Sequence, residues 1–135
     1  MSGGESPIGR TALVRRTFTA EDVRAFSVLT GDLNPLHVPP EGAKRPRRPL
    51  VQGAFLSALG PTLVGTELPG PGTVYMSQTF KYHLPVYAGD TVEVRGEIVG
   101  YEPVEHNYTV LITCRNDMDE LVMDGTMIVQ RTPRD

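Results

Sequence analysis

The nonapeptide LTGDLNPLH, residues 29–37, contains two residue types that carry out acid–base chemistry, Asp32 and His37. A carboxylate accepts a proton and a histidine titrates near neutral pH, so the two groups could activate one water molecule and deliver one proton. The same letters also suit a structural turn, because Asp, Asn and Pro favour turn conformations. The residues alone leave both interpretations open.

The overall composition restricts the classes of function. The 135 residues predict a single domain, 1–135, in which the small and polar residues 1–10 form a loose start. A net charge of −3 disfavours nucleic-acid binding. Cys114 is the only cysteine, which favours a reducing, cytoplasmic compartment. No stretch approaches the roughly 20 apolar residues of a membrane span. The spacing Asp-x4-His supplies at most two ligands, so we expect no metal site.

The first half of the chain predicts one strand and two helices. Residues 11–18 are rich in β-branched residues and predict a strand. Residues 20–30 predict a short amphipathic helix, because Thr19 and Asp22 have the spacing of a capping box. The stretch 38–49 is too rich in proline for regular structure. Residues 50–63 are apolar nearly all round and predict a buried helix.

Two prolines bear on the predicted helix at 50–63. We expect Pro49 to occupy its first turn, and Pro61 to distort or end it. After a turn-rich stretch, four segments alternate apolar and polar residues and predict antiparallel strands: 73–82, 91–100, 107–115 and 121–131. A sheet with one polar face needs an apolar cover on the other, which the helix at 50–63 can supply. The sequence therefore predicts an α+β hot-dog fold, a curved antiparallel sheet wrapped around a central apolar helix.

Three stretches, in order, carry a family resemblance. They are FSVLTGDLNPLHV at 26–38, PLVQGAFLSAL at 49–59 and QTFKYHLPVYAGDTVEV at 78–94. Their Gly-Asp-x-Asn-Pro-aliphatic-His core, helix start and Pro-Val-x-x-Gly-Asp turn resemble the MaoC-like dehydratases and (R)-specific enoyl-CoA hydratases. The resemblance extends from about residue 11 to 130. It implies a hydro-lyase that hydrates trans-2-enoyl thioesters to (R)-3-hydroxyacyl thioesters, or runs the reverse dehydration.

The resemblance also implies residue roles. Asp32 would be the general base that takes a proton from water, and His37 would orient that water and help to supply the proton to C2. Asn34 would position the loop. The backbone N–H of Gly53 would bind the thioester oxygen. No cofactor is implied beyond the coenzyme A or phosphopantetheine of the substrate, and the expected partners are a second copy in a homodimer or higher homo-oligomer and, in one alternative, an acyl carrier protein.

The sequence departs from the family pattern at two places. Gln52 stands where members usually have His; a substrate contact is one interpretation, and a solvated or capping side chain is the favoured one. The second departure is the Pro-rich stretch 38–49, which stands where members usually have an acidic residue and a short helix. A basic run in this stretch is either a solvated loop or a contact to the phosphates of coenzyme A or phosphopantetheine. Its members are Lys44, Arg45, Arg47 and Arg48.

Other functions of the fold stay open at this stage. A thioesterase is disfavoured, because the predicted helix at 50–63 contains no Asp or Glu. A specialised dehydratase or lyase of a biosynthetic pathway, acting on an unusual acyl group, has the same sequence features as a fatty-acyl enzyme. A non-catalytic binding or assembly protein is disfavoured by the retention of Asp32 and His37, which a pure scaffold does not need.

Overall fold

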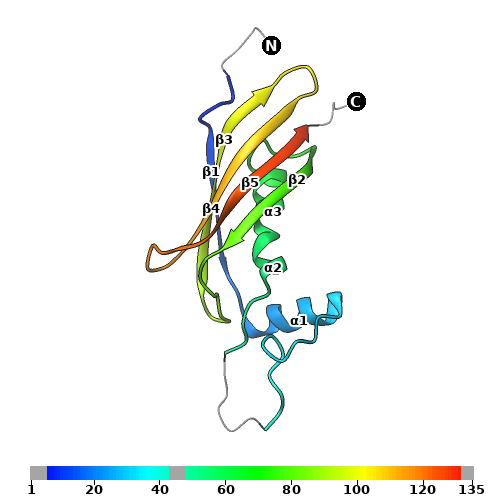
Figure 1. Ribbon diagram of the computed structural model, residues 1–135, viewed down its shortest axis with the longest axis vertical. Coiled ribbons are helices and arrows are strands. Elements are labelled where there is room, and N and C mark those ends of the chain that lie inside the picture. The colour runs from blue at the N-terminus through cyan, green and yellow to red at the C-terminus, as the bar shows by residue number, and fades with distance from the viewer. Residues whose placement is uncertain (1–5, 43–47, 132–135) are drawn as a thin grey trace.

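The computed structural model describes residues 6–42 and 48–131, so the predicted loose start lies partly outside the described residues. Within these ranges five strands form one antiparallel sheet in the order β1-β3-β4-β5-β2, which curves around a central helical segment (Figure 1). In chain order the elements are β1 (Thr11–Thr17), α1 (Ala20–Thr30), α2 (Gly53–Ser57), α3 (Leu59–Thr66), β2 (Thr73–Tyr82), β3 (Thr91–Glu102), β4 (Asn107–Asn116) and β5 (Leu121–Arg131). The predicted hot-dog fold is confirmed.

The central helix differs from its predicted bounds. It begins at Gly53 rather than at residue 50, and it continues to Thr66 in two pieces that meet at Ala58. Pro61 explains the division, because proline has no N–H to donate to the carbonyl group of residue 57 and its ring crowds that carbonyl. The expectation that Pro49 lies in the first turn was wrong. The chain at 50–52 is extended instead.

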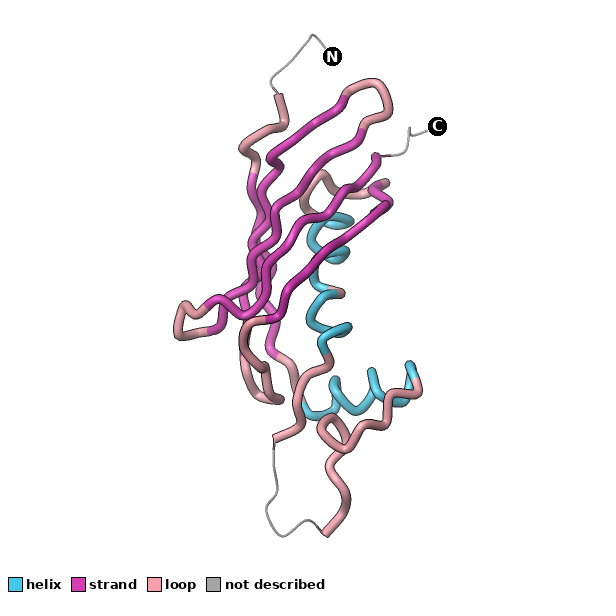
Figure 2. The backbone as a smooth tube through the Cα atoms, viewed as in Figure 1, coloured by secondary structure: helices cyan, strands magenta, loops and turns pink. Residues whose placement is uncertain are grey.

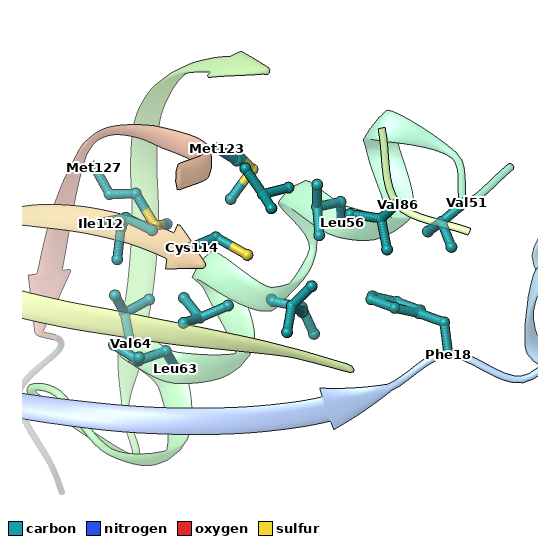
Figure 3. Packing of buried hydrophobic residues seen from close by; sticks show 14 of the residues in the cluster. Phe18, Val51, Leu56, Leu63, Val64, Val86, Ile112, Cys114, Met123 and Met127 are labelled. Atoms are coloured by element: carbon teal, nitrogen blue, oxygen red, sulfur yellow. The ribbon is translucent and has the colours of Figure 1, made fainter. Parts of the chain in front are cut away.

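The core lies between the central helix and the concave face of the sheet (Figure 3). Leu63 and Val64 of α3 are at most 1% exposed. The predicted alternation places apolar side chains of β3 and β4 against this helix, and it is confirmed by their burial; the buried residues are Val92, Val94, Ile98, Val110, Ile112 and Cys114.

Helix α1 lies outside the sheet, across the end at which α2 starts (Figure 1). The predicted capping box is present: Asp22 N–H donates to Thr19 Oγ1, and Thr19 N–H donates to the Asp22 carboxylate, both at 3.0 Å. The ring of Phe26 stacks on that of Phe55 of α2 at 4.8 Å. The segment that leaves α1 loops away from the sheet before the chain returns to α2 (Figure 2).

Candidate active site

The end of α1 directs the chain into the motif 29–37. Gly31 has the left-handed conformation, with a φ of 81°, and its N–H donates to Ser27 O at 2.9 Å. Glycine adopts this conformation without the steric strain of a side chain, so it ends the helix cleanly. The next N–H, of Asp32, donates to Thr30 Oγ1 at 3.3 Å. Asp32 therefore occupies a defined position two residues beyond Thr30, the last residue of α1.

Two side-chain turns shape the rest of the motif. Asn34 N–H donates to Asp32 Oδ1 at 3.3 Å, and Leu36 N–H donates to Asn34 Oδ1 at 3.0 Å. The turn expected from the Asp, Asn and Pro residues is thus real. The turn uses only Oδ1 of Asp32, so Oδ2 remains available for acid–base chemistry. The Asn34 side chain bonds within this turn, and its role in positioning the Asp32 side chain stays a prediction.

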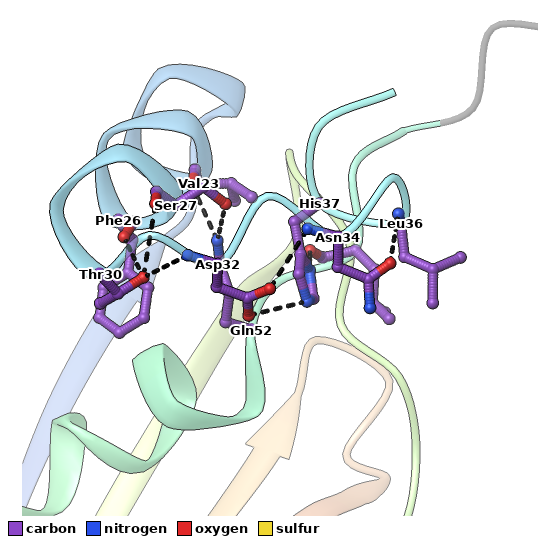
Figure 4. A network of polar contacts seen from close by, with 10 residues as sticks. Val23, Phe26, Ser27, Thr30, Asp32, Asn34, Leu36, His37 and Gln52 are labelled. Atoms are coloured by element: carbon purple, nitrogen blue, oxygen red, sulfur yellow. Dashed lines mark hydrogen bonds and ion pairs between the residues drawn. The ribbon is translucent and has the colours of Figure 1, made fainter. Parts of the chain in front are cut away.

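His37 lies against the second oxygen of Asp32. Its Nε2 is 3.6 Å from Asp32 Oδ2, and its Nδ1 is 2.6 Å from the carbonyl oxygen of Leu50 (Figure 4). A carbonyl oxygen only accepts hydrogen bonds, so Nδ1 carries a hydrogen and the neutral ring presents the lone pair of Nε2 to the carboxylate. The imidazole is about 10% exposed, whereas the Asp32 carboxylate is 47% exposed.

The two facing atoms define what the pair can bind. Oδ2 of ionised Asp32 and Nε2 of neutral His37 are both acceptors, and 3.6 Å is longer than a hydrogen bond. A molecule with two donor hydrogens, such as water, satisfies both acceptors at once. The arrangement can therefore orient a water molecule while the carboxylate accepts one of its protons.

Gly53 follows, by three residues, the Leu50 whose carbonyl group holds His37. It is the first residue of α2 and is exposed, and a Cβ at this position would lie 3.5 Å from the Tyr82 ring. It lines a mainly apolar pocket of about 280 Å³, formed also by Leu50, Val51, Leu56, Tyr82, His83, Leu84, Pro85 and Val86. Leu50 connects the pocket to the pair, because its carbonyl oxygen accepts the His37 bond. The role of the Gly53 N–H stays a prediction.

Gln52 is neither a solvated nor a helix-capping side chain, the two roles that the sequence favoured for it. Its side chain is 2% exposed, so it is not solvated, and it makes no capping hydrogen bond to α2. Its Nε2 donates instead to Val23 O at 2.9 Å and to Ser27 Oγ at 2.7 Å. A capping residue must accept from the helix N–H groups, whereas this side chain donates away from α2, to α1. The predicted substrate contact stays a prediction, but the structure gives this amide another partner.

The basic run is described only at its last residue. Arg48 forms an ion pair with Asp90 at 2.8 Å, and its guanidinium lies 5.4 Å from the centre of the Tyr87 ring. Its charge is therefore engaged with the turn before β3. Lys44, Arg45 and Arg47 lie outside the described residues, so the phosphate contact proposed for the run stays a prediction.

Sequence reasoning missed two parts of the site. The first is Leu50, whose contribution is a backbone carbonyl group and so has no signal in its side chain. The second is Ser27, a polar residue that is 0% exposed on α1. Its position one turn after Val23, on the apolar face of the helix, was the available signal. The described residues contain no group of three or more His, Cys, Asp or Glu arranged to hold a metal ion, and no helix among them is long and apolar enough to cross a membrane.

Known proteins resemble this chain both in sequence and in structure. The chain is 35% identical to a 3-hydroxybutyryl-CoA dehydratase of Methylorubrum extorquens, covering 91% of this chain and 79% of the relative. It is 38% identical to an (R)-specific enoyl-CoA hydratase of Aeromonas caviae, covering 73% and 75%. A solved (R)-hydratase structure from A. caviae, involved in PHA biosynthesis, superposes with a TM-score of 0.85 at 30% identity, over 98% of this chain and 100% of the other. The MaoC like domain model matches residues 5–118, and the chain belongs to this family.

Proposed function

We propose that the protein is a hydro-lyase that adds water to trans-2-enoyl thioesters to give (R)-3-hydroxyacyl thioesters, or catalyses the reverse dehydration. The relatives named above are a dehydratase and a hydratase of acyl-CoA thioesters. The observation that carries the proposal is the pair of acceptors formed by Asp32 and His37. Such a pair is suited to water as a reactant, which is the molecule that this reaction adds or removes.

The proposed reaction assigns one step to each group. Asp32 takes a proton from water as the water oxygen bonds to C3, and the electron pair of the double bond moves toward the thioester. His37 orients the water through Nε2 and helps to supply to C2 the proton that Asp32 took from the water. The N–H of Gly53 holds the thioester oxygen while that oxygen carries negative charge. Dehydration follows the same steps in reverse.

The substrate carrier in this proposal is coenzyme A or the phosphopantetheine of an acyl carrier protein. A mitochondrial relative from Solanum lycopersicum, 34% identical over 87% of this chain and 73% of the relative, is named a 3-hydroxyacyl-[acyl-carrier-protein] dehydratase. Basic residues that follow the motif 29–37 in the sequence suit the phosphates of either carrier; they are Arg45 and Arg47, since the charge of Arg48 is paired with Asp90. No cofactor enters the proposed steps.

We also propose a homodimer or higher homo-oligomer in a cytoplasmic setting. Strand β2 lies at one edge of the sheet, and its Val74, Tyr75 and Met76 are 49%, 51% and 60% exposed. Leu29, next to the catalytic turn, is 85% exposed. An open strand edge and exposed apolar side chains are features that a second subunit can cover. A specialised biosynthetic dehydratase on an unusual acyl group is the second candidate.

The test measures the loss of enone absorbance when the purified protein is mixed with crotonyl-CoA. Asp32→Asn and His37→Ala should each lower kcat by about 10²- to 10⁴-fold, the usual contribution of a general acid or base. Asp117→Asn is the matched control, because Asp117 pairs with Arg15 on the outer face of the sheet. A folded wild type that is inactive on crotonyl-CoA, longer enoyl-CoA and carrier-bound enoyl thioesters would favour a binding protein instead.

A further inference from the structure

We propose that Gln52 is a positioning residue, which fixes the Asp32–His37 pair by clamping α1 to the chain segment that holds His37. The inference rests on the function proposed above for that pair, and it goes beyond it by assigning a role to a residue outside the reacting groups. Gln52 itself touches neither Asp32 nor His37 through a hydrogen bond. It acts through α1 on one side and through residues 50–52 on the other.

The side chain of Gln52 is enclosed between α1 and the start of α2. It is 2% exposed, and both of its partners, Val23 and Ser27, are 0% exposed (Figure 4). The orientation of the amide follows from Val23, because a carbonyl oxygen must face the NH₂ group and not the amide oxygen. The Oε1 atom is buried and has no hydrogen-bond partner among the described residues. The contribution of this side chain is therefore its two donors.

Residues 50–52 hold His37 directly. Leu50 O accepts the hydrogen of His37 Nδ1 at 2.6 Å, and Leu50 N–H donates to Leu36 O at 2.8 Å. Val51 N–H donates to Val86 O at 2.8 Å, which ties the same segment to the chain that follows β2. The ring of His37 therefore takes its place and its tautomer from this short extended segment.

Gln52 holds the Asp32 side of the pair. Its donor bond to Ser27 Oγ reaches the last turn of α1, where Ser27 O accepts the N–H of Gly31, the residue before Asp32. The two ends of the motif are thus attached to the same three-residue segment, His37 through Leu50 and Asp32 through Gln52. A shift of α1 relative to this segment would change the distance from Asp32 to His37, which is the quantity that the proposed reaction depends on.

Three substitutions at Gln52 separate donor chemistry from packing. Gln52→Leu keeps similar volume and removes both donors. Gln52→Glu keeps the shape and places an acceptor against Val23 O. Gln52→His retains one N–H donor. We expect Leu and Glu to lower kcat by about 10- to 100-fold with little change in KM, because a displacement near 1 Å has effects of that size. We expect the kcat of Gln52→His to stay within a few-fold of the wild-type kcat.

The control is Gln130→Leu. Gln130 Nε2 also donates to a backbone carbonyl, that of Glu105, at 3.0 Å, but at the far end of β5. This variant should leave kcat unchanged. A Gln52→Leu protein that melts at a lower temperature but keeps the wild-type kcat would overturn the proposal, since it would show a purely structural role. If Gln52→Leu does not fold, Ser27→Ala removes the Oγ acceptor more gently, and an unchanged kcat in that variant would also overturn it.

A readout without turnover keeps this inference distinct from the proposed function. The ring nitrogens of His37 can be observed by ¹⁵N NMR in wild type, Gln52→Leu and Gln130→Leu. We expect the His37 signals to move only in Gln52→Leu. Moved signals in a protein that hydrates no thioester would support the clamp and reject the function, whereas unmoved signals in an active protein would reject the clamp and keep the function.

Discussion

His37 donates its Nδ1 hydrogen to the carbonyl oxygen of Leu50 at 2.6 Å, and this bond leaves Nε2 as the nitrogen that faces Asp32. The first prediction concerns the tautomer. In ¹⁵N NMR spectra at a pH where the ring is neutral, His37 should carry its hydrogen on Nδ1 and show Nε2 as unprotonated. Exposed His106 provides an internal reference in the same spectrum. A hydrogen on Nε2 of neutral His37 would contradict the geometry described for the pair.

The second prediction concerns the capping box of α1 and pH. The hydrogen bond from the Thr19 backbone, with smaller help from the Thr19 hydroxyl and from Arg16, lowers the pKa of Asp22 below its ordinary value, against a partial opposing effect of desolvation. A lowered folded pKa contributes stability above the unfolded value of about 3.9, and the contribution is lost as the pH falls through the folded pKa. Above about pH 5 the wild type should have a higher melting temperature than Asp22→Asn, and the two melting temperatures should converge in stronger acid.

The matched control for that experiment is Glu21→Gln, in the same first turn but outside the capping box. The difference in melting temperature between wild type and Glu21→Gln should depend less on pH. A melting difference between wild type and Asp22→Asn that is constant from neutral pH to strong acid would contradict the assigned role of the carboxylate.

The third prediction concerns the thiol. Cys114 is 0% exposed in β4, and burial raises its pKa to about 12. At pH 8 the group is a protonated thiol, which is a poor nucleophile. The native protein should react with a disulfide reagent such as DTNB only at the rate at which it unfolds, whereas the urea-unfolded protein should react at once. Rapid reaction of the native protein would place Cys114 outside the core.

The fourth prediction concerns close packing between β2 and β5. Gly125 pairs with Phe80, and a Cβ at Gly125 would overlap the backbone carbonyl oxygen of Thr79. A backbone atom cannot move aside as a flexible side chain can, so Gly125→Ala should lower the free energy of unfolding by about 3 kcal/mol or more. Denaturant titration measures this change.

Gly65 provides the opposite case for the same substitution. It lies in α3, and a Cβ there meets no atom within 4 Å. Gly65→Ala should raise stability by about 0.5–1 kcal/mol, because alanine loses less backbone entropy in a helix. Equal effects of the two substitutions would show that local packing does not decide the outcome.

Local patterns predicted the parts of this structure that depend on neighbouring residues. The capping box of Thr19 and Asp22, the helix end at Gly31 and the alternation in β3 are each set by interactions over a few positions, and each was readable from the sequence. The Asp32–His37 pair belongs partly to this class, because the side-chain turns at Asp32 and Asn34 bring the chain round within six residues.

The parts that escaped prediction depend on contacts between distant segments. Gln52 stands just before the apolar stretch that begins at Gly53 and suggests a helix cap, but its actual partners lie 25 and 29 positions earlier, on α1. The start of the central helix was placed three residues too early, because Leu50 and Val51 are apolar and helix-compatible yet are drawn into extended pairing with Val86 and Tyr87. Propensity does not report such competition between tertiary hydrogen bonds and helix formation.

The described residues assigned to the site, apart from the Tyr82–Val86 wall of the apolar pocket, occur between Val23 and Leu56, whereas four of the five strands of the described sheet follow residue 72. The segment that holds His37 is fixed by Val86 and Tyr87. A growing chain therefore contains both members of the proposed acid–base pair before it contains the residues that support them. A fragment ending after α3 would carry Asp32, His37 and Gly53 with only one strand, so the groups proposed to react are made early in synthesis, and the supports of His37 follow only with the second half of the chain.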